Sequence, residues 1–381
     1  MQNVQSPIIP IVRELIEKHP GTISLGQGVV HYPPPACASE GLARFMQAGN
    51  HLYGAVGGMA ALVKRIEAKL REENGISAGA ETRIVVTAGG NMAFLNAILA
   101  VCDPGDEVII LSPYYFNHEM AIAIASAKPV PVATDANFQP DLEAIANAIT
   151  NRTRAIVTVS PNNPTGAVYP QASLRAINAL CASRGIYHIH DEAYEYFVYD
   201  GAKHFSPGSI DGAAKHTISL YSLSKAYGFA GWRIGYMVIP DGLYAAVQKI
   251  QDTNLICPPM ISQFAGLRVL ENGPQYCHER IRDLAKVRQM VLDHLAEVRS
   301  LLTVPRCQGA MYFLARVHTG LGDMDLVTRL ISDYRVAVIP GNTFGITEGC
   351  YVRISYGALD ASAVAEGISR FVRGIQEIVG R

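Results

Sequence analysis

Hydrophobic and polar positions along the chain follow two periods, one typical of helices and one typical of strands. Between residues 58 and 73, apolar residues recur every three or four positions and the run ends at Gly75, which predicts an amphipathic helix. Short apolar runs and amphipathic stretches then alternate. Strands are predicted at 83–87, 107–111, 129–133, 155–159, 186–190, 217–221 and 234–239, and helices at 11–19, 91–101, 117–126, 141–149 and 172–183.

The pattern changes from about residue 240 onward. Helical periodicity dominates to about residue 299, and 274–299 is predicted to form one long helix. Strands at 311–317 and 351–355 and helices at 324–333 and from 361 follow. Short apolar strands joined by helices predict an α/β fold with a mainly parallel sheet between helices. The pattern after about residue 240 predicts a second, smaller α+β domain. We predict that 48–280 forms the large domain and that 1–47 plus 281–381 form the small one.

Composition excludes several classes of protein. The 381 residues are 49% hydrophobic and 17% charged, which is typical of a chain with a large core rather than a disordered one. The formal net charge of −1 offers no electrostatic basis for binding nucleic acid or an anionic membrane. Seven cysteines without a CxxC pair, and no leader-like or membrane-spanning stretch, predict a cytoplasmic protein with reduced thiols.

Unusual segments follow four of the predicted strands. In an open α/β sheet, ligands bind beyond the carboxyl ends of the strands, so these segments are expected to lie together at one edge. They are Gly89-Gly90-Asn91, the 161–166 segment with Asn163, Asp191-Glu192-Ala193-Tyr194, and Ser222-Leu223-Ser224-Lys225.

Several of these residues predict a phosphate site. A glycine pair between strand and helix, Gly89-Gly90, lets backbone N–H groups approach an anion, although a tight turn explains it equally well. The hydroxyls of Ser222 and Ser224 can donate hydrogen bonds, and the guanidinium of Arg233 can bind phosphate with two. Arg233 stands in the run Gly-Trp-Arg-Ile-Gly, which is unlike an exposed surface segment.

Lys225 adds a second function to the same segment. A lysine amine forms a Schiff base with a carbonyl when its surroundings lower its pKa. Pyridoxal phosphate carries both an aldehyde and a phosphate, and it needs an acidic group beside its ring nitrogen. Asp191, at the end of an apolar strand, is the candidate for that group. Asn163 and Tyr194 are candidates for hydrogen bonds to the ring's phenolic oxygen.

The sequence also offers residues for two other kinds of site, a metal site and a serine nucleophile. His188 and His190 share one face of a strand and a carboxylate pair follows them, but a metal site needs three or four converging ligands, and buried histidines are the simpler interpretation. No metal is therefore expected. A serine nucleophile at Ser222 or Ser224 is disfavoured because no GxSxG turn surrounds either residue.

In their order, these motifs resemble the class I and II aminotransferases of pyridoxal phosphate fold type I. The resemblance extends over nearly the whole chain. Its most specific parts are the Asn-Pro-Thr-Gly run, the Asp-x-Ala-Tyr strand end, and Ser-x-Ser-Lys with an arginine eight residues later. They begin at Asn163, Asp191 and Ser222. The resemblance implies a seven-stranded large domain. It also implies that Lys225 holds the cofactor and moves the substrate proton, with Asp191 beside the ring nitrogen.

Four further residues receive roles only from the resemblance. Tyr115 matches the ring that stacks on the cofactor, with Tyr114 as a rival. Arg353 matches the arginine that binds the substrate carboxylate, and a charge inside an apolar strand needs such a partner. Gly28 matches a loop residue that closes over the substrate. Tyr53 matches a residue that reaches the neighbouring subunit's phosphate, which implies a homodimer with shared active sites. Asn163 is also expected to contact substrate.

The resemblance implies transfer of an amino group from an L-amino acid to a 2-oxo acid. The runs Leu25–Gly28 and Pro33–Pro35 resemble the subgroup that acts on neutral, aromatic or sulphur-containing amino acids. One alternative is a lyase of the same fold that cleaves the Cβ–S bond of cysteine conjugates. A less favoured one is a non-enzymatic sensor module, which would require a DNA-binding domain.

Overall fold

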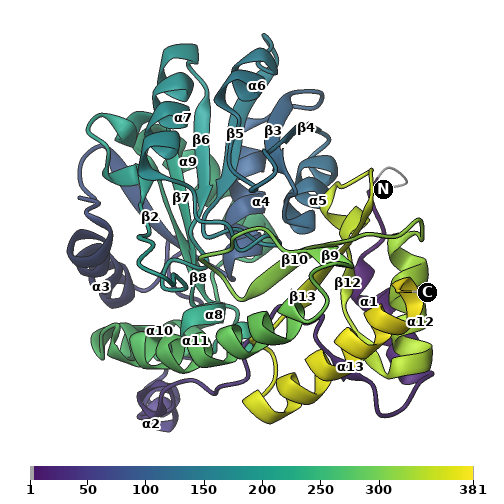
Figure 1. The fold of residues 1–381 in the computed structure, drawn as a ribbon. Coiled ribbons are helices and arrows are strands. Elements are labelled where there is room, and N and C mark those ends of the chain that lie inside the picture. The colour runs from purple at the N-terminus through teal and green to yellow at the C-terminus, as the bar shows by residue number, and fades with distance from the viewer. Residues whose placement is uncertain (1–3, 381) are drawn as a thin grey trace.

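The computed structural model of the protein describes residues 4–380 and is built around a seven-stranded sheet (Figure 1). Its strand order is β2-β8-β7-β6-β5-β3-β4. Each of the seven strands predicted between residues 83 and 239 is present. Their bounds are β2 Thr82–Thr87, β3 Glu107–Ser112, β4 Lys128–Ala133, β5 Thr153–Val159, β6 Tyr187–Asp191, β7 Thr217–Ser222 and β8 Gly235–Pro240.

Strand direction places the chemically unusual segments at one edge of this sheet. Strands β7, β6, β5, β3 and β4 pair in parallel, whereas β8 is antiparallel to both β7 and β2. Gly235, the first residue of β8, is therefore paired with Ser222 and Thr87, the last residues of β7 and β2. Arg233, which precedes β8, thus lies at the same edge as the segments that follow β2 and β7.

Helices cover both faces of the sheet, and the burial of alternate residues shows why the strands are mainly apolar. In β2, Ile84 and Val86 belong to one hydrophobic cluster and Val85 to another. The first cluster includes residues of α3 (Ala60–Lys69), α6 (Leu142–Asn147), α7 (Gln171–Arg184) and α10 (Met260–Glu271). The second includes residues of α4 (Gly90–Val101), α5 (Phe116–Ile124) and α9 (Tyr244–Asn254). Both faces are buried, so most side chains on each face are apolar.

The second part of the molecule contains a four-stranded antiparallel sheet of order β12-β13-β10-β9. It comprises β9 Leu302–Thr303, β10 Tyr312–Val317, β12 Ile339–Pro340 and β13 Cys350–Ser355, with α12 Asp323–Tyr334 and α13 Ala361–Val379. Helix α11 (Gln275–Ala296) agrees with the predicted 274–299 helix. It packs against α13, while its Arg288 forms an ion pair with Asp200 at 2.8 Å, so it joins the two parts (Figure 1).

Several short elements were not predicted. Strand β1 (Ile23–Ser24) pairs in parallel with β11 (Val336–Ala337), and two residues are too few to show a period. Helices α2 (Leu42–Gln47) and α8 (Leu223–Ala226) are similarly short. Helix α1 covers Ile8–Glu17, whereas 11–19 was predicted. Pro10 stands in its first turn, where a missing N–H breaks no hydrogen bond, so the helix begins earlier than expected.

Residues 4–47 pack against both parts of the structure. Helix α1 and strand β1 contact α12, β12 and β11, whereas α2 and the turn Ala36–Ala38 contact α10. The division into 48–280 and 1–47 plus 281–381 stays a prediction.

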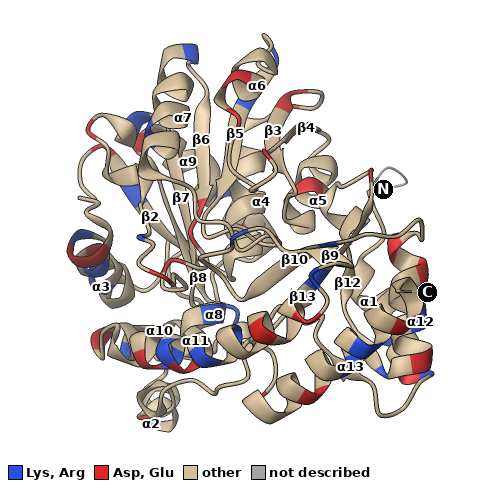
Figure 2. Cartoon of the chain, viewed as in Figure 1, with Lys and Arg blue, Asp and Glu red and all other residues tan. Residues whose placement is uncertain are grey.

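Charged side chains lie mainly on the outer helices. Figure 2 shows both signs interspersed over α3, α11 and α12. No helix within residues 4–380 is long and apolar enough to cross a membrane.

Candidate active site

A pocket opens at the sheet edge where the four segments meet. Residues from the ends of β5, β6 and β7, from the start of α4 and from the segment before β8 line its wall. The lining comprises Gly90, Asn91, Tyr115, Val159, Asn163, Asp191, Ala193, Tyr194, Ser222, Ser224, Lys225 and Arg233. The structure therefore brings together most of the residues that the sequence predicted, from six separate stretches of the chain.

One end of the pocket is built to receive an anion. Arg233 Nη1 lies 3.5 Å from Ser224 Oγ, and Arg233 Nη2 donates to the carbonyl of Ala88 at 3.2 Å. Gly89 has φ +82°, and a Cβ there would lie 2.4 Å from Arg233 Nη2, so only glycine leaves room for the guanidinium. Arg233 itself has φ +53°, a conformation that costs a non-glycine residue about 1–3 kcal/mol. The free N–H groups of α4 begin at Gly90 on the same side.

Lys225 occupies the middle of the pocket. Its Nζ donates to the carbonyl of Gly28, and its own carbonyl accepts a hydrogen bond from Tyr32 Oη at 3.1 Å. Burial, together with the positive charges of Arg353 and Arg233, lowers the pKa of Lys225 to about 8, and the negative charge of Asp191 partly opposes them. A substantial fraction of the amine is therefore unprotonated near neutral pH, which is the nucleophilic form.

Asp191 is buried at the end of β6, with 8% of its surface exposed. Its Oδ1 accepts the N–H of Ala193 at 2.9 Å, and its Oδ2 lies 3.1 Å from His118 Nε2. His118 stacks on Phe94, with ring centres 3.9 Å apart, and contacts Tyr115 edge-on. These contacts hold the carboxylate in one orientation toward the pocket. Sequence reasoning missed His118, because its contact with Asp191 joins residues far apart in the chain.

Arg353 and Asn163 form a buried pair beside the pocket. Arg353 Nη1 donates to Asn163 Oδ1 at 2.8 Å, and Arg353 Nη2 donates to the carbonyl of Gly26 at 2.7 Å. Only 2% of the arginine is exposed, its Nε has no partner, and no carboxylate neutralises it among residues 4–380. A buried guanidinium without an anion is costly unless a ligand supplies one. A carboxylate ligand would meet this need.

Tyrosines surround the centre of the pocket. Tyr194 Oη and Tyr312 Oη share a hydrogen bond of 2.7 Å, and the guanidinium carbon of Arg353 lies 4.5 Å from the centre of the Tyr312 ring. Tyr115 Oη donates to Asn91 Oδ1 at 3.3 Å. Tyr114 instead lines a separate small cavity, so the structure places Tyr115, not its rival, in the pocket. Tyr312 carried no recognisable signal in the sequence.

Comparison with known proteins identifies the family. The family model described as aminotransferase class I and II matches residues 20–371. An aromatic aminotransferase from Arabidopsis thaliana is 33% identical over 383 residues, covering 98% of this chain and 94% of the relative. The chain belongs to the class I and II aminotransferases.

Two further comparisons agree with this assignment. An aspartate/prephenate aminotransferase from Thermus thermophilus is 34% identical over 358 residues, covering 92% of this chain and 90% of the relative. The solved aspartate aminotransferase of Rhizobium meliloti superposes with a TM-score of 0.91 at 30% identity, covering 98% of this chain and 97% of that one. The protein is thus an aminotransferase that depends on pyridoxal phosphate. These relatives give the lyase alternative no support.

The pocket of this aminotransferase fits pyridoxal phosphate on its own geometry. The anion end, with its left-handed Gly89 and the guanidinium of Arg233, suits a phosphate dianion. The buried amine of Lys225 suits an aldehyde, and the carboxylate of Asp191 suits a protonated ring nitrogen. Tyr115 supplies an aromatic surface at the same wall.

Four expected site residues of the aminotransferase lie outside the pocket lining: Gly89, Arg353, Gly28 and Tyr53. Gly89 precedes Gly90, and Arg353 donates to Asn163, so both adjoin the lining. Gly28 is next to it, because its carbonyl accepts from Lys225 and a Cβ at Gly28 would lie 3.0 Å from Tyr312 Oη. Tyr53 is 80% exposed and lines a shallow surface groove with Leu52, Pro258 and Ile261. Within one chain, Tyr53 therefore does not line the cofactor pocket.

The two buried histidines of β6 are held by hydrogen bonds within the large sheet. His188 Nε2 and His190 Nδ1 both share hydrogen bonds with Thr158 Oγ1, at 2.8 and 2.6 Å. Burial lowers the pKa of His188 to about 3, so the ring stays neutral. No cluster of three or more His, Cys, Asp or Glu side chains suited to a metal occurs within the described part of the chain.

The lowered pKa of Lys225 predicts how cofactor capture depends on pH. Below pH 8 the unprotonated fraction of the amine rises about tenfold per pH unit, so capture of pyridoxal phosphate by the cofactor-free protein should accelerate until about pH 8 and then level off. In Arg353→Met a positive neighbour is lost, which raises the pKa of Lys225 and shifts the midpoint to higher pH. Stopped-flow absorbance of both proteins measures this. An unchanged midpoint would contradict the coupling.

Proposed function

We propose that the protein moves the amino group of a neutral, aromatic or sulphur-containing L-amino acid to a 2-oxo acid. One observation carries this proposal: the buried amine of Lys225 lies near two charged groups of opposite sign. One is the guanidinium of Arg353, which has no anionic partner among the described residues, and the other is the carboxylate of Asp191. All α-amino acids and 2-oxo acids share a carboxylate that Arg353 can hold. Proton transfer next to that carboxylate is then within reach of Lys225.

Support for a substrate with an uncharged side chain comes from the pocket's own charges. Its cationic side chains are Lys225 and Arg233, with Arg353 beside it, and each has a role in the proposal. A dicarboxylate such as aspartate needs a further cation, and no other lysine or arginine lines the pocket within residues 4–380. The rings of Tyr115 and Tyr194 favour contact with aromatic or apolar side chains. The relatives include both an aromatic and an aspartate/prephenate aminotransferase.

The positions of the pocket residues support a proposed role for each of them toward the cofactor. Gly89, Gly90, Asn91, Ser222, Ser224 and Arg233 would hold the phosphate of the cofactor, Asn163 and Tyr194 its phenolic oxygen, Asp191 its ring nitrogen and Tyr115 its ring face. When bound, the cofactor supplies an electron sink for the bond that breaks at the substrate Cα.

The protein's own groups then act in sequence. Arg353 and Asn163 orient the substrate through its carboxylate, so that the Cα proton faces Lys225. The Lys225 amine, kept partly unprotonated by burial, removes that proton and later returns one. The carboxylate of Asp191, held by His118, would lie beside the ring nitrogen and stabilise its positive charge. Tyr312 fixes Tyr194 through their shared hydrogen bond.

A half-reaction screen tests the substrate proposal. The holoenzyme is mixed with single L-amino acids and the cofactor absorbance is followed. Phenylalanine, tyrosine or methionine should convert the bound cofactor to its amino form faster than aspartate by at least about tenfold, while released 2-oxo acid is measured by chromatography. Faster conversion by aspartate would overturn the preference. Pyruvate, ammonia and a thiol from cysteine conjugates would instead indicate a lyase.

Arg353→Lys should weaken all substrates together. Lysine keeps the charge but loses the planar pair of donors, which we expect to raise every KM by roughly 30-fold, for about 2 kcal/mol of lost hydrogen bonding. Steady-state kinetics with several amino donors and 2-oxo acids measure this. A loss confined to one substrate would show that Arg353 recognises a side chain.

We also propose that two chains form a homodimer in which Tyr53 serves the opposite active site. The support is the exposure of Leu52 (71%) and Tyr53 (80%) beside the groove formed with Pro258, Pro259 and Ile261. Large apolar side chains gathered on one surface are typical of an interface. In a two-fold dimer, each Tyr53 would lie at its partner's site.

Subunit complementation tests this arrangement. Tyr53→Asp and Lys225→Ala chains, each inactive alone, are mixed in equal amounts and allowed to exchange. Half of the dimers should be mixed, and each has one intact site, so activity should recover to about one quarter of the wild-type level. Differently tagged chains confirm mixing. Proven mixed dimers without recovered activity would place Tyr53 outside the shared site.

A further inference from the structure

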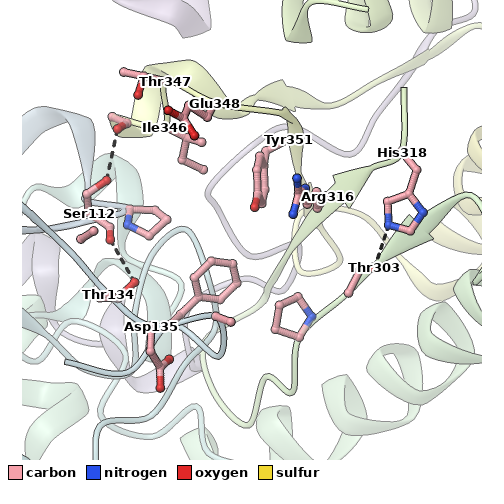
Figure 3. A pocket seen from close by; sticks show the side chains of 16 residues that line it. Ser112, Thr134, Asp135, Thr303, Arg316, His318, Ile346, Thr347, Glu348 and Tyr351 are labelled. Carbon is pink, nitrogen blue, oxygen red and sulfur yellow. Dashed lines mark hydrogen bonds between the residues drawn. The ribbon is translucent and has the colours of Figure 1, made fainter. Parts of the chain in front are cut away.

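A second cavity lies between the two parts of the molecule, away from the cofactor pocket. We call it the outer groove. It has a volume of about 460 Å³, within the range of small-molecule sites. Its walls come from the ends of β3 and β4, from β9 and β10, and from the segment before β13 (Figure 3). No residue lines both this groove and the cofactor pocket.

Arg316 is the cationic side chain of the outer groove that has no anionic partner in the described part of the structure. It lies on β10, opposite Tyr351 on β13 and Thr303 on β9, so the three side chains are on one face of the sheet. Its guanidinium carbon is 6.0 Å from the centre of the Tyr351 ring. Within residues 4–380 it has neither an ion-pair partner nor a side-chain hydrogen bond, so its donors are available to a ligand.

The neighbouring histidine has different surroundings. Both ring nitrogens of His318 have partners, Thr303 Oγ1 at 2.9 Å and the carbonyl of Ser300 at 3.3 Å, as Figure 3 shows for Thr303. His318 therefore forms part of the wall, and Arg316 is the cationic side chain whose N–H groups are available to a ligand. Pro113, Phe138 and Ile346 give the groove an apolar surface beside that donor. An apolar wall with one convergent guanidinium is the usual composition of a site for a small carboxylate.

The acidic residues of the groove restrict the ligand further. Figure 3 shows Asp135 and Glu348 across the groove from Arg316, and neither forms an ion pair with it. Their carboxylates repel a second anionic group. A monocarboxylate with an apolar or aromatic body fits these charges better than a dicarboxylate or a phosphate ester.

A buried ring separates the outer groove from the active site. Phe344 precedes Gly345 of the groove wall, is fully buried, and lies 5.1 Å from the guanidinium carbon of Arg353. Along β13, Tyr351 faces the groove and Arg353, two residues on, faces the cofactor pocket. Both stand on the same face of the strand. A ligand in the groove would therefore contact the strand that carries Arg353.

We infer that the outer groove is a second ligand site, which binds a small monocarboxylate with an aromatic or apolar body through Arg316. The site is independent of the reaction proposed above, because it shares no lining residue with the cofactor pocket.

Photoaffinity labelling of the holoenzyme with 3-(4-azidophenyl)propanoate tests the inference. Active-site arginines also bind carboxylates, so the labelled peptides must be located by mass spectrometry. We expect label within 133–138 or 345–351, removed by excess 3-phenylpropanoate but not by its neutral amide. Arg316→Gln should reduce this label by at least tenfold and leave label at the cofactor pocket and transaminase activity unchanged.

The control is Arg329→Gln, an exposed arginine on α12, which should label like the wild type. Absence of label in the outer groove would overturn the inference, and so would equal labelling of Arg316→Gln. Competition by the neutral amide would also overturn it, because binding would then not depend on charge. Each result is read from the position of the label, so it remains interpretable even if the proposed substrate class is wrong.

Discussion

Replacing Lys225 with alanine is expected to lower turnover by about 10⁴-fold or more while the protein still binds pyridoxal phosphate. Among the described residues that line the pocket, Lys225 supplies the amine with a lowered pKa that can move the substrate proton, and loss of a positioned base costs roughly 10²–10⁴-fold. Loss of the covalent attachment adds to this. The anion end of the pocket, with Ser222, Ser224 and Arg233, is unchanged, so binding should survive.

Two measurements separate these effects. Borohydride reduction of the wild type should fix the cofactor to the peptide that contains Lys225, and equilibrium dialysis should show that Lys225→Ala still holds cofactor. The matched control is Lys286→Ala, an exposed lysine on α11, which should be fully active. Label on a different lysine, or an active Lys225→Ala, would remove Lys225 from the chemistry.

Asp191→Asn is expected to reduce kcat by about 10³-fold, which corresponds to about 4 kcal/mol of lost transition-state stabilisation. Asparagine keeps the size of the side chain but loses the carboxylate charge that we propose lies beside the ring nitrogen. The carboxylate is buried and held by His118, so water cannot replace its charge. Asp191→Glu keeps the charge and should lose less activity.

Comparing Asp191→Asn with Asp191→Glu tests whether the charge of residue 191 is what supports turnover. If charge is what matters, glutamate should retain at least tenfold more activity than asparagine, and both proteins should keep the wild-type unfolding temperature within a few degrees. His118→Asn should produce a smaller loss of kcat, since it only orients the carboxylate. An Asp191→Asn enzyme with a near-normal rate would show that Asp191 does not support the cofactor ring.

The amino-acid sequence determined the regular part of this protein by itself. The apolar runs of β2 to β8 could be recognised because both faces of that sheet are buried, so most positions along each strand are apolar. The glycine pair at 89–90, Lys225 and Arg233 could be recognised because phosphate binding and Schiff-base chemistry restrict residue types at short spacing. Sheet geometry then predicted that segments 70 residues apart would share one edge.

Only the tertiary structure decided features that depend on distant contacts. His118 reaches Asp191 and Tyr312 reaches Tyr194 across 73 and 118 residues, and no local pattern records such pairs. The choice between Tyr114 and Tyr115 depended on which ring the turn after β3 directs into the pocket. Arg316 was an ordinary strand residue until cross-strand pairing placed it beside Tyr351. Periodicity reports which face is buried, but which side chains meet on that face is set by packing between elements.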